Sequence, residues 1–203
     1  QGHVEQCRNM KKYFAEFFGA FVLSLVVGLS VSGQFPIVTP VLAGLTLGLF
    51  VYTIGVISGC HINPAVTVGL LSIGKIKMNE AAKYIVAQLL GGFLASVLLV
   101  QMSLSLPPIL AGGMTQILAE TLGTMMLAFG VASIVFGKVS DVASGLVIGG
   151  SLLLGISIAA MMGSAGILNP AVGLALNAYH PTYLIGQILG AFLGFNLYKN
   201  LQK

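Results

Sequence analysis

Apolar and small residues run along most of the chain, in long stretches that are separated by polar or turn-forming residues. The stretches predict helices near residues 14–32, 38–56, 83–101, 116–136, 142–162 and 181–199. A helix needs about 20 apolar residues to cross a bilayer, and each stretch is of that order. Strands of a membrane β-barrel would alternate polar and apolar residues, whereas residues 21–29 and 146–158 are apolar or small throughout. The pattern therefore predicts an all-α membrane protein with six transmembrane helices.

Two uncharged regions, residues 17–74 and 142–198, are longer than the two spans predicted in each. The remainder of each region is apolar but interrupted by Gly and Pro, so a further regular crossing helix is not expected. Irregular backbone at membrane depth is tolerated only where it is buried in protein or lines a water-filled cavity. We therefore expect two re-entrant half-helices and a pore. The turns between spans are predicted at Ser32-Gly33-Gln34, Pro107-Pro108, Gly137-Lys138 and His180-Pro181.

Composition supports this class and excludes others. Of 203 residues, 57% are hydrophobic and 7% are charged, against about 25% charged in soluble domains. Such a chain is neither an ordinary soluble domain nor disordered. Two cysteines cannot form a disulfide framework, and the net charge of +4 requires no nucleic-acid partner. The residues form no set of nucleophile, base and orienting group and no phosphate-binding loop, so an enzyme is not expected, nor is a cofactor.

The positive charges indicate the topology. With the N-terminus in the cytoplasm, all nine Lys and Arg lie on the cytoplasmic side of six spans. The predicted external segments 33–37, 102–115 and 163–180 contain neither residue. The first span follows a basic stretch but lacks a clear small-residue cleavage site, so a signal peptide is not expected. We expect an integral protein of the plasma (cell inner) membrane with both termini in the cytoplasm.

The two halves of the chain resemble each other. Ala15-Glu16 and Ala119-Glu120 open them, Asn63-Pro64-Ala65-Val66 recurs as Asn169-Pro170-Ala171-Val172, and Gln88 recurs as Gln187. Because each half has three spans, the second enters the membrane from the opposite face, which predicts an inverted repeat. The chain is read as one transmembrane channel domain, 1–203, with repeats at about 10–103 and 115–200.

The repeated motifs suit a pore. Asn is a favoured N-cap and Pro a favoured first helical residue, so each Asn-Pro-Ala starts a short helix. The two helices would point their positive ends at one spot, where Asn63 and Asn169 present amide donors to a neutral solute. Glu16 and Glu120 are ionisable residues in apolar helices, which makes them functional candidates. We favour a bracing role for both, in which each accepts backbone N–H groups of a re-entrant segment.

These motifs resemble the aquaporins, or major intrinsic proteins, over essentially the whole chain. The resemblance rests on Asn63, Pro64, Ala65, Asn169, Pro170 and Ala171, with Ala-Glu at the start of spans one and four. It implies an hourglass channel in each monomer, homotetramers in a lipid bilayer, no covalent chemistry, and a bracing role for His61.

The chain departs from the family pattern at the selectivity filter. The family places an Arg directly after the second Asn-Pro-Ala, where this chain has Val172. The other filter positions fall on Ala43, Gly166 and Ser157, or on Ile156 if the register slips by one. Small residues without the Arg predict a wide, weakly polar pore for water, glycerol-like polyols and urea. An alternative is that Phe50, Tyr52 or Met162 rebuilds a narrow filter.

A second hypothesis is a channel for cations or metal ions, because the missing Arg removes a barrier to them. Soft-metal ligands are available in Cys60 and His61 before the first motif, and in Met161 and Met162 after the fifth span. Their spacing matches no zinc site, and Met at a helix end is usually packing. No resident metal is expected.

Overall fold

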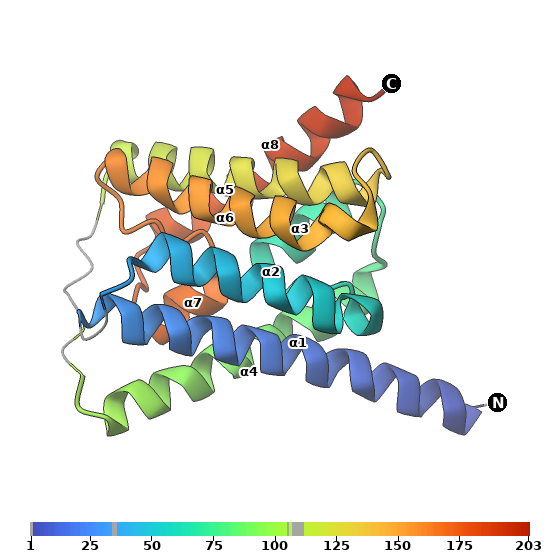
Figure 1. The fold of residues 1–203 in the computed structure, drawn as a ribbon, viewed down its shortest axis with the longest axis horizontal. Helices are drawn as coiled ribbons and strands as arrows, with labels where there is room; N and C mark the ends of the chain where they lie inside the picture. The colour runs from blue at the N-terminus through green and yellow to red at the C-terminus, as the bar shows by residue number, and fades with distance from the viewer. Residues whose placement is uncertain (1, 34–35, 105, 107–111) are drawn as a thin grey trace.

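The computed structural model describes residues 2–33, 36–104, 106 and 112–203, with side-chain environments from Met10 onward. Every regular element in these residues is helical (Figure 1). The predicted turns at Gln34 and Pro107-Pro108, and parts of the predicted external segments, lie outside the described residues. In chain order the elements are α1 (Gly2–Val31), α2 (Thr39–Ser58), α3 (Pro64–Ser72), α4 (Met78–Gln101), α5 (Met114–Val135), the 3-10 turn η1 (Asp141–Ala143), α6 (Ser144–Met161), α7 (Pro170–Ala175) and α8 (Pro181–Leu201).

Each of the six predicted spans corresponds to one long helix. Five of these are long and apolar enough to cross a membrane by length and composition alone, namely α1 from Met10, α2, α4, α5 and α6 with η1. The sixth, α8, has 21 residues, and at about 1.5 Å per residue it also matches the bilayer core of about 30 Å. The two short helices, α3 and α7, begin at the Asn-Pro-Ala motifs.

The halves pack as an inverted repeat. In the first half α1 contacts α2 and α4, and in the second half α5 contacts α6 and α8. The halves join where α2 and α6 run side by side (Figure 1). Each half-helix reaches across to the last helix of the other half, so that α3 contacts α8 and α7 contacts α4. This exchange brings the starts of both half-helices to the middle of the bundle.

Glycines let α2 and α6 approach to backbone contact. A Cβ atom on Gly44 would lie 2.7 Å from the carbonyl oxygen of Gly149, and one on Gly48 would lie 2.7 Å from that of Gly145. Both distances are shorter than any real Cβ contact, so side chains are excluded from this crossing. Small residues are the usual means of close helix packing in membranes. The crossing fixes two walls of the central pathway.

Candidate permeation pathway

The two Asn-Pro-Ala motifs each cap a half-helix. The Asn63 side-chain oxygen accepts hydrogen bonds from the backbone N–H groups of Ala65, at 2.8 Å, and Val66, at 3.4 Å. The Asn169 oxygen accepts from the N–H of Ala171 at 2.9 Å. Both asparagines have extended backbone, with φ of −154° and −149°, and a Pro follows each at the first helical position. This is the N-cap geometry that the sequence favours.

The same two side chains tie the halves together. The amide nitrogen of Asn63 donates to the carbonyl of Leu168 at 2.9 Å, and that of Asn169 donates to the carbonyl of Ile62 at 3.0 Å. Because an amide nitrogen carries two hydrogens, each Asn keeps one N–H beyond this contact. Both side chains line the narrow part of the pathway described below. A hydrogen-bond donor of each half is therefore held at the same depth.

Glu16 holds the first re-entrant segment. It is fully buried and accepts hydrogen bonds from the Ser58 hydroxyl at 2.6 Å, the N–H groups of His61 and Ile62 at 2.9 and 2.6 Å, and the Gln88 amide at 2.7 Å. Four donors thus converge on one carboxyl group, which satisfies a polar group that would otherwise be costly to bury.

Glu120 has the equivalent set in the second half. It is fully buried and accepts from the Ser164 hydroxyl at 2.5 Å, the N–H groups of Ile167 and Leu168 at 3.0 and 2.9 Å, and the Gln187 amide at 3.2 Å. The inverted repeat therefore extends from the sequence to individual hydrogen bonds. Both glutamates make the contacts with re-entrant backbone that a bracing role requires.

These contacts hold residues in an unfavourable backbone conformation. Cys60, Ile62 and Leu168 have φ of 52°, 38° and 54°, in the left-handed region that non-glycine residues rarely adopt. Gly166, the repeat equivalent of Cys60, has φ of 65°. Such strain persists only where surrounding structure over-determines it, and here the two carboxyl groups do so.

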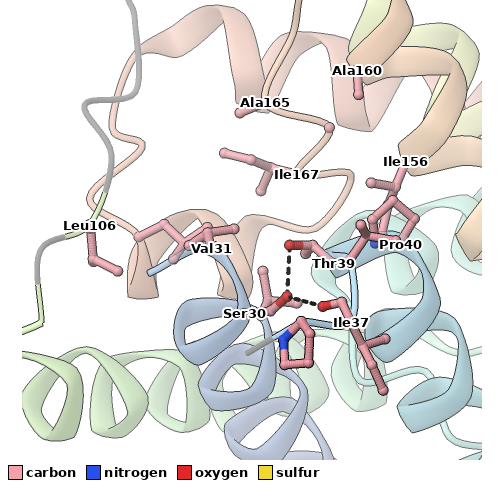
Figure 2. Close-up of a pocket in the computed structure, with 15 residues that line it drawn as sticks. Ser30, Val31, Ile37, Thr39, Pro40, Leu106, Ile156, Ala160, Ala165 and Ile167 are labelled. Atoms are coloured by element: carbon pink, nitrogen blue, oxygen red, sulfur yellow. Dashed lines mark hydrogen bonds between the residues drawn. The ribbon is translucent and has the colours of Figure 1, made fainter. Parts of the chain in front are cut away.

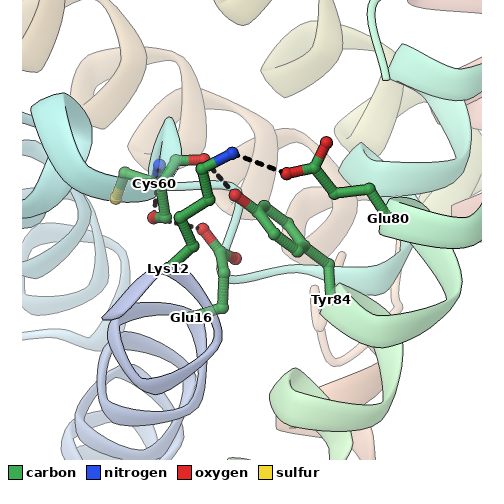
Figure 3. A network of polar contacts seen from close by, with 6 residues as sticks. Lys12, Glu16, Cys60, Glu80 and Tyr84 are labelled. Atoms are coloured by element: carbon green, nitrogen blue, oxygen red, sulfur yellow. Dashed lines mark hydrogen bonds and ion pairs between the residues drawn. The ribbon is translucent and has the colours of Figure 1, made fainter. Parts of the chain in front are cut away.

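Further contacts link this network to the N-terminal parts of α1 and α4 (Figure 3). The Tyr84 hydroxyl donates to the carbonyl of Ser58 at 2.7 Å, and Lys12 forms an ion pair with Glu80 at 2.8 Å. The His61 ring lies edge-on to Tyr84, with a centroid distance of 5.0 Å, and its Nδ1 is 3.1 Å from a threonine hydroxyl of α3. The side chain of His61 is thus held by its neighbours.

Two cavities joined by a narrow neck form the pathway through the bundle. The cavity on the side predicted to be external, here called the outer cavity, has a volume of about 420 Å³; among the described residues that line it, Ser30 and Thr39 have the polar side chains (Figure 2). The inner cavity, of about 500 Å³, includes the charged residues Lys75 and Asp141 in its lining. Between them the neck has about 20 Å³, room for about one water molecule. The shape is an hourglass.

The linings of the three spaces overlap, so each cavity adjoins the neck. Three residues line both the outer cavity and the neck: Val27, Ile156 and Ile167. Five residues line both the neck and the inner cavity: Cys60, His61, Val66, Val131 and Ile148. We call these two groups the outer junction and the inner junction.

The structure places the expected filter residues as follows. Ala43 and Val172 line the neck, and Gly166 lines the outer cavity. Of the two alternatives on α6, Ile156 lines both spaces, while the Ser157 hydroxyl donates to the carbonyl of Leu153 at 2.8 Å within its own helix. The pathway therefore meets an aliphatic side chain on α6 in place of a hydroxyl.

The structure differs from the expectation of a wide constriction. Small residues do occupy the filter positions, but aliphatic side chains from neighbouring positions fill the space and leave a narrow neck. The side chains that narrow the neck are also not Phe50, Tyr52 or Met162, which the sequence offered as alternatives. Phe50 packs edge-on against Phe18 at 5.9 Å, Tyr52 lines the inner cavity, and Met162 packs against the hydrophobic core without lining the neck.

Val27 and Ile167 are pathway residues that the sequence reasoning missed. Val27 lies on α1, which contributes no filter position in the family pattern, and Ile167 lies between two expected residues. The repeat could have indicated Ile167, because it corresponds to the candidate His61 when the halves are aligned; Val27 corresponds to Val131, which no sequence motif singles out.

The soft-metal candidates are not brought together. Cys60 and His61 line the neck and inner cavity, whereas Met161 is 80% exposed on the outside of the bundle. Within the described residues no three His, Cys, Asp or Glu side chains are grouped so that they could hold a metal ion. The geometry therefore gives no support to metal passage.

Known proteins resemble this chain over most of its length. The family model for the major intrinsic proteins matches residues 3–115. Aquaporin AqpM of Methanothermobacter thermautotrophicus is 30% identical, over 93% of this chain and 93% of that protein. A probable glycerol uptake facilitator protein of Thermotoga maritima is also 30% identical, over 93% of this chain and 98% of that protein. The X-ray structure of the aquaglyceroporin from Plasmodium falciparum shares the fold, with a TM-score of 0.74 and 21% identity over 96% of this chain and 97% of that one.

Proposed function

Because this chain belongs to the major intrinsic protein family, a family of membrane channels rather than enzymes, we propose that it conducts water and small neutral solutes such as glycerol and urea. The observation that carries the proposal is the succession of two cavities with one neck between them, which share lining residues, with Asn63 and Asn169 at the neck. The relatives named as an aquaporin and a glycerol uptake facilitator support the same solute class.

The chemistry of the neck favours a neutral solute. Its lining contains no Lys, Arg, Asp or Glu, so nothing there replaces the hydration shell of an ion with opposite charge. The positive ends of both half-helices point toward it, which disfavours cations further. A hydroxyl or amide solute can accept from the two Asn amides on one side and place its carbon atoms against the aliphatic wall on the other.

The neck has room for one water molecule, so water passes in single file. Glycerol and urea are wider than water, and their passage requires the lining Leu, Ile and Val side chains to change rotamer. A narrow neck with a soft wall is therefore compatible with the proposed solutes.

Stopped-flow light scattering on proteoliposomes tests the proposal. Vesicles with the protein should shrink faster than empty vesicles in an impermeant osmolyte, and should reswell in glycerol or urea. Planar bilayers with the protein should carry no current under voltage. Protein-dependent cation current, or volume changes no faster than in empty vesicles, would contradict the proposal.

Val172→Arg tests the position of the constriction. Val172 is 2% exposed and lines the neck, so an Arg there fills the neck with a long cation. The neck has only about 20 Å³ of free space, so the larger side chain should block it and glycerol flux should fall about tenfold or more. Val172→Ala, which adds nothing to the neck, should keep the flux. Unchanged glycerol flux in the Arg variant would show that Val172 does not line the constriction.

We also propose a homotetramer in the plasma (cell inner) membrane, with both termini in the cytoplasm. The topology is supported by the distribution of the nine Lys and Arg, and both chain ends lie at the same end of the bundle (Figure 1). The tetramer is supported by family membership. Mass measurement in detergent tests the assembly, and a reporter fused after Lys203 tests the topology. A monomeric mass, or a reporter active only outside the cytoplasm, would contradict the respective proposal.

A further inference from the structure

The two junctions of the pathway occupy equivalent positions in the inverted repeat. Val27 and Val131 each lie eleven residues after the buried glutamate of their own half, on α1 and α5. Ile167 and His61 each lie two residues before the capping asparagine of their own half. The outer junction contains Val27 and Ile167, and the inner junction contains Val131 and His61. The two ends of the neck are therefore formed by residues at equivalent positions of the two halves.

The side chains of the inner and the outer junction differ in polarity. The inner junction includes the imidazole of His61 and the thiol of Cys60, and it opens into a cavity that Lys75 and Asp141 also line. The outer junction consists of Val27, Ile156 and Ile167, whose side chains can neither donate nor accept a hydrogen bond. A solute that crosses it loses hydration and gains no side-chain hydrogen bond in exchange.

The outer cavity offers a solute few side-chain hydrogen bonds to replace the hydration that it loses at the outer junction. The hydroxyls of Ser30 and Thr39 are 2.9 Å apart and bond to each other, and the Ser30 hydroxyl also lies 3.4 Å from the carbonyl of Ile37 (Figure 2). The side chains of the other described residues in the lining are aliphatic or proline. Solutes therefore approach the outer junction through apolar surroundings.

We propose that the outer junction is the specificity-determining constriction, and that it selects among small neutral solutes by how weakly they are hydrated. The inference rests on the proposed channel function and names its preferred substrate class. That class is small neutral solutes with one polar edge and an apolar remainder, such as N-alkylated ureas. Val27 and Ile167, which lie outside the expected filter positions, determine it together with Ile156.

Urea and methylurea separate this mechanism from selection by size. Methylurea is larger, so a constriction that selects by size passes it more slowly than urea. It also carries one more methyl group and one fewer N–H, so a constriction that selects by hydration passes it faster. Transfer of one methylene-sized group out of water is favourable by an amount equivalent to about a fourfold preference.

The experiment measures the permeability of proteoliposomes to both ureas, each corrected for empty vesicles. The wild-type ratio of methylurea to urea should be about two to four. Val27→Thr adds a hydroxyl to the outer junction at nearly constant shape and should lower the ratio at least about twofold. Val131→Thr makes the same change at the repeat-equivalent position of the inner junction and compares the two ends of the neck. Val86→Thr, at a side chain of α4 that is 58% exposed, is the control and should leave the ratio as in wild type. Ile156→Thr is a second outer variant if the first does not fold.

The outcomes are distinguishable. A wild-type ratio below one, an unchanged ratio in a folded outer variant, or an equal fall in Val131→Thr would overturn this inference and leave the channel function standing. Absence of protein-dependent flux for both ureas, together with water flux no faster than in empty vesicles, would overturn the channel function itself; absence of urea flux alone would overturn this inference. A ratio that falls only in the outer variants supports the outer junction as the constriction that selects.

Discussion

At the scale of single residues, two buried carboxyl groups hold the irregular part of the pathway. Glu16 and Glu120 each receive four hydrogen bonds, two of them from backbone N–H groups of a re-entrant segment. An uncompensated polar group at this depth would cost several kcal/mol. The donors that satisfy each carboxyl group include backbone N–H groups of the residues with positive φ next to the neck. Loss of a carboxyl group should therefore lower the stability of the protein and change the shape of the neck.

Glu120→Gln tests this coupling. Ser164 and Ile167 donate to one carboxyl oxygen, and Leu168 and Gln187 donate to the other, so the NH₂ of a Gln faces a backbone N–H, which cannot accept, in either orientation. We expect a loss of about 2 kcal/mol or more, seen as a lower melting temperature in detergent, and reduced water flux.

Glu80→Gln is the matched control for that change. Glu80 forms a partly exposed ion pair with Lys12, with side-chain exposures of 32% and 27%. Such pairs contribute about 1 kcal/mol or less, so this variant should melt near the wild-type temperature and keep its flux. Equal melting temperatures for the two Gln variants would contradict a bracing role for Glu120.

The sequence patterns indicated which backbone groups the Asn and Glu side chains would contact. They did not indicate which side chains would line the narrow neck. Asn before Pro, and a lone Glu in an apolar helix, indicate their partners because few hydrogen-bonding groups exist at membrane depth. Counting residues along the family pattern could not settle whether Ile156 or Ser157 of α6 faces the pathway. A shift of one residue turns a helical side chain by about 100°, and the length of the preceding turn sets that register.

At the scale of elements, hydropathy located all six long helices because the bilayer requires long apolar runs. It did not locate the polar extensions of two of them. The helix α1 begins at Gly2 and α4 at Met78, where the pattern predicted starts near residues 14 and 83. Residues beyond the apolar core carry no membrane signal, so their helical state depends on local propensity and packing.

The crossing of α2 and α6 offers a test at this scale. A Cβ atom on Gly149 would clash with the carbonyl oxygen of Gly44, whereas one on the adjacent Gly150 meets nothing within 4 Å. Gly149→Ala should therefore push the helices apart and destabilise the protein by about 1–3 kcal/mol, with altered solute flux. Gly150→Ala should be neutral or slightly stabilising. Melting curves in detergent compare the two, and equal stability would contradict backbone contact at the crossing.

At the scale of the whole molecule, the inverted repeat explains the hourglass. Each half supplies one re-entrant segment and one bracing glutamate, and the exchange of half-helices places both asparagines at one depth. The sequence repeat predicted this symmetry. It could not predict the narrow neck, because the aliphatic side chains that line it come from α1, α2, α3, α5, α6, α7 and the re-entrant segments before α3 and α7. Their convergence is a property of the folded bundle.

The central claim is that water and solutes pass through the neck of each chain. The most direct test is the water permeability of proteoliposomes containing Ala43→Leu. Ala43 is 1% exposed and lines a neck of about 20 Å³, so the added isobutyl group should close it. Leu45→Phe enlarges a side chain that is 65% exposed on the outside of the same helix and serves as the control.

For folded, equally reconstituted protein, we expect Ala43→Leu to lower the water permeability close to that of empty vesicles. We expect Leu45→Phe to have the water permeability of wild type. Wild-type water permeability in Ala43→Leu would show that water takes another route, and would contradict the account.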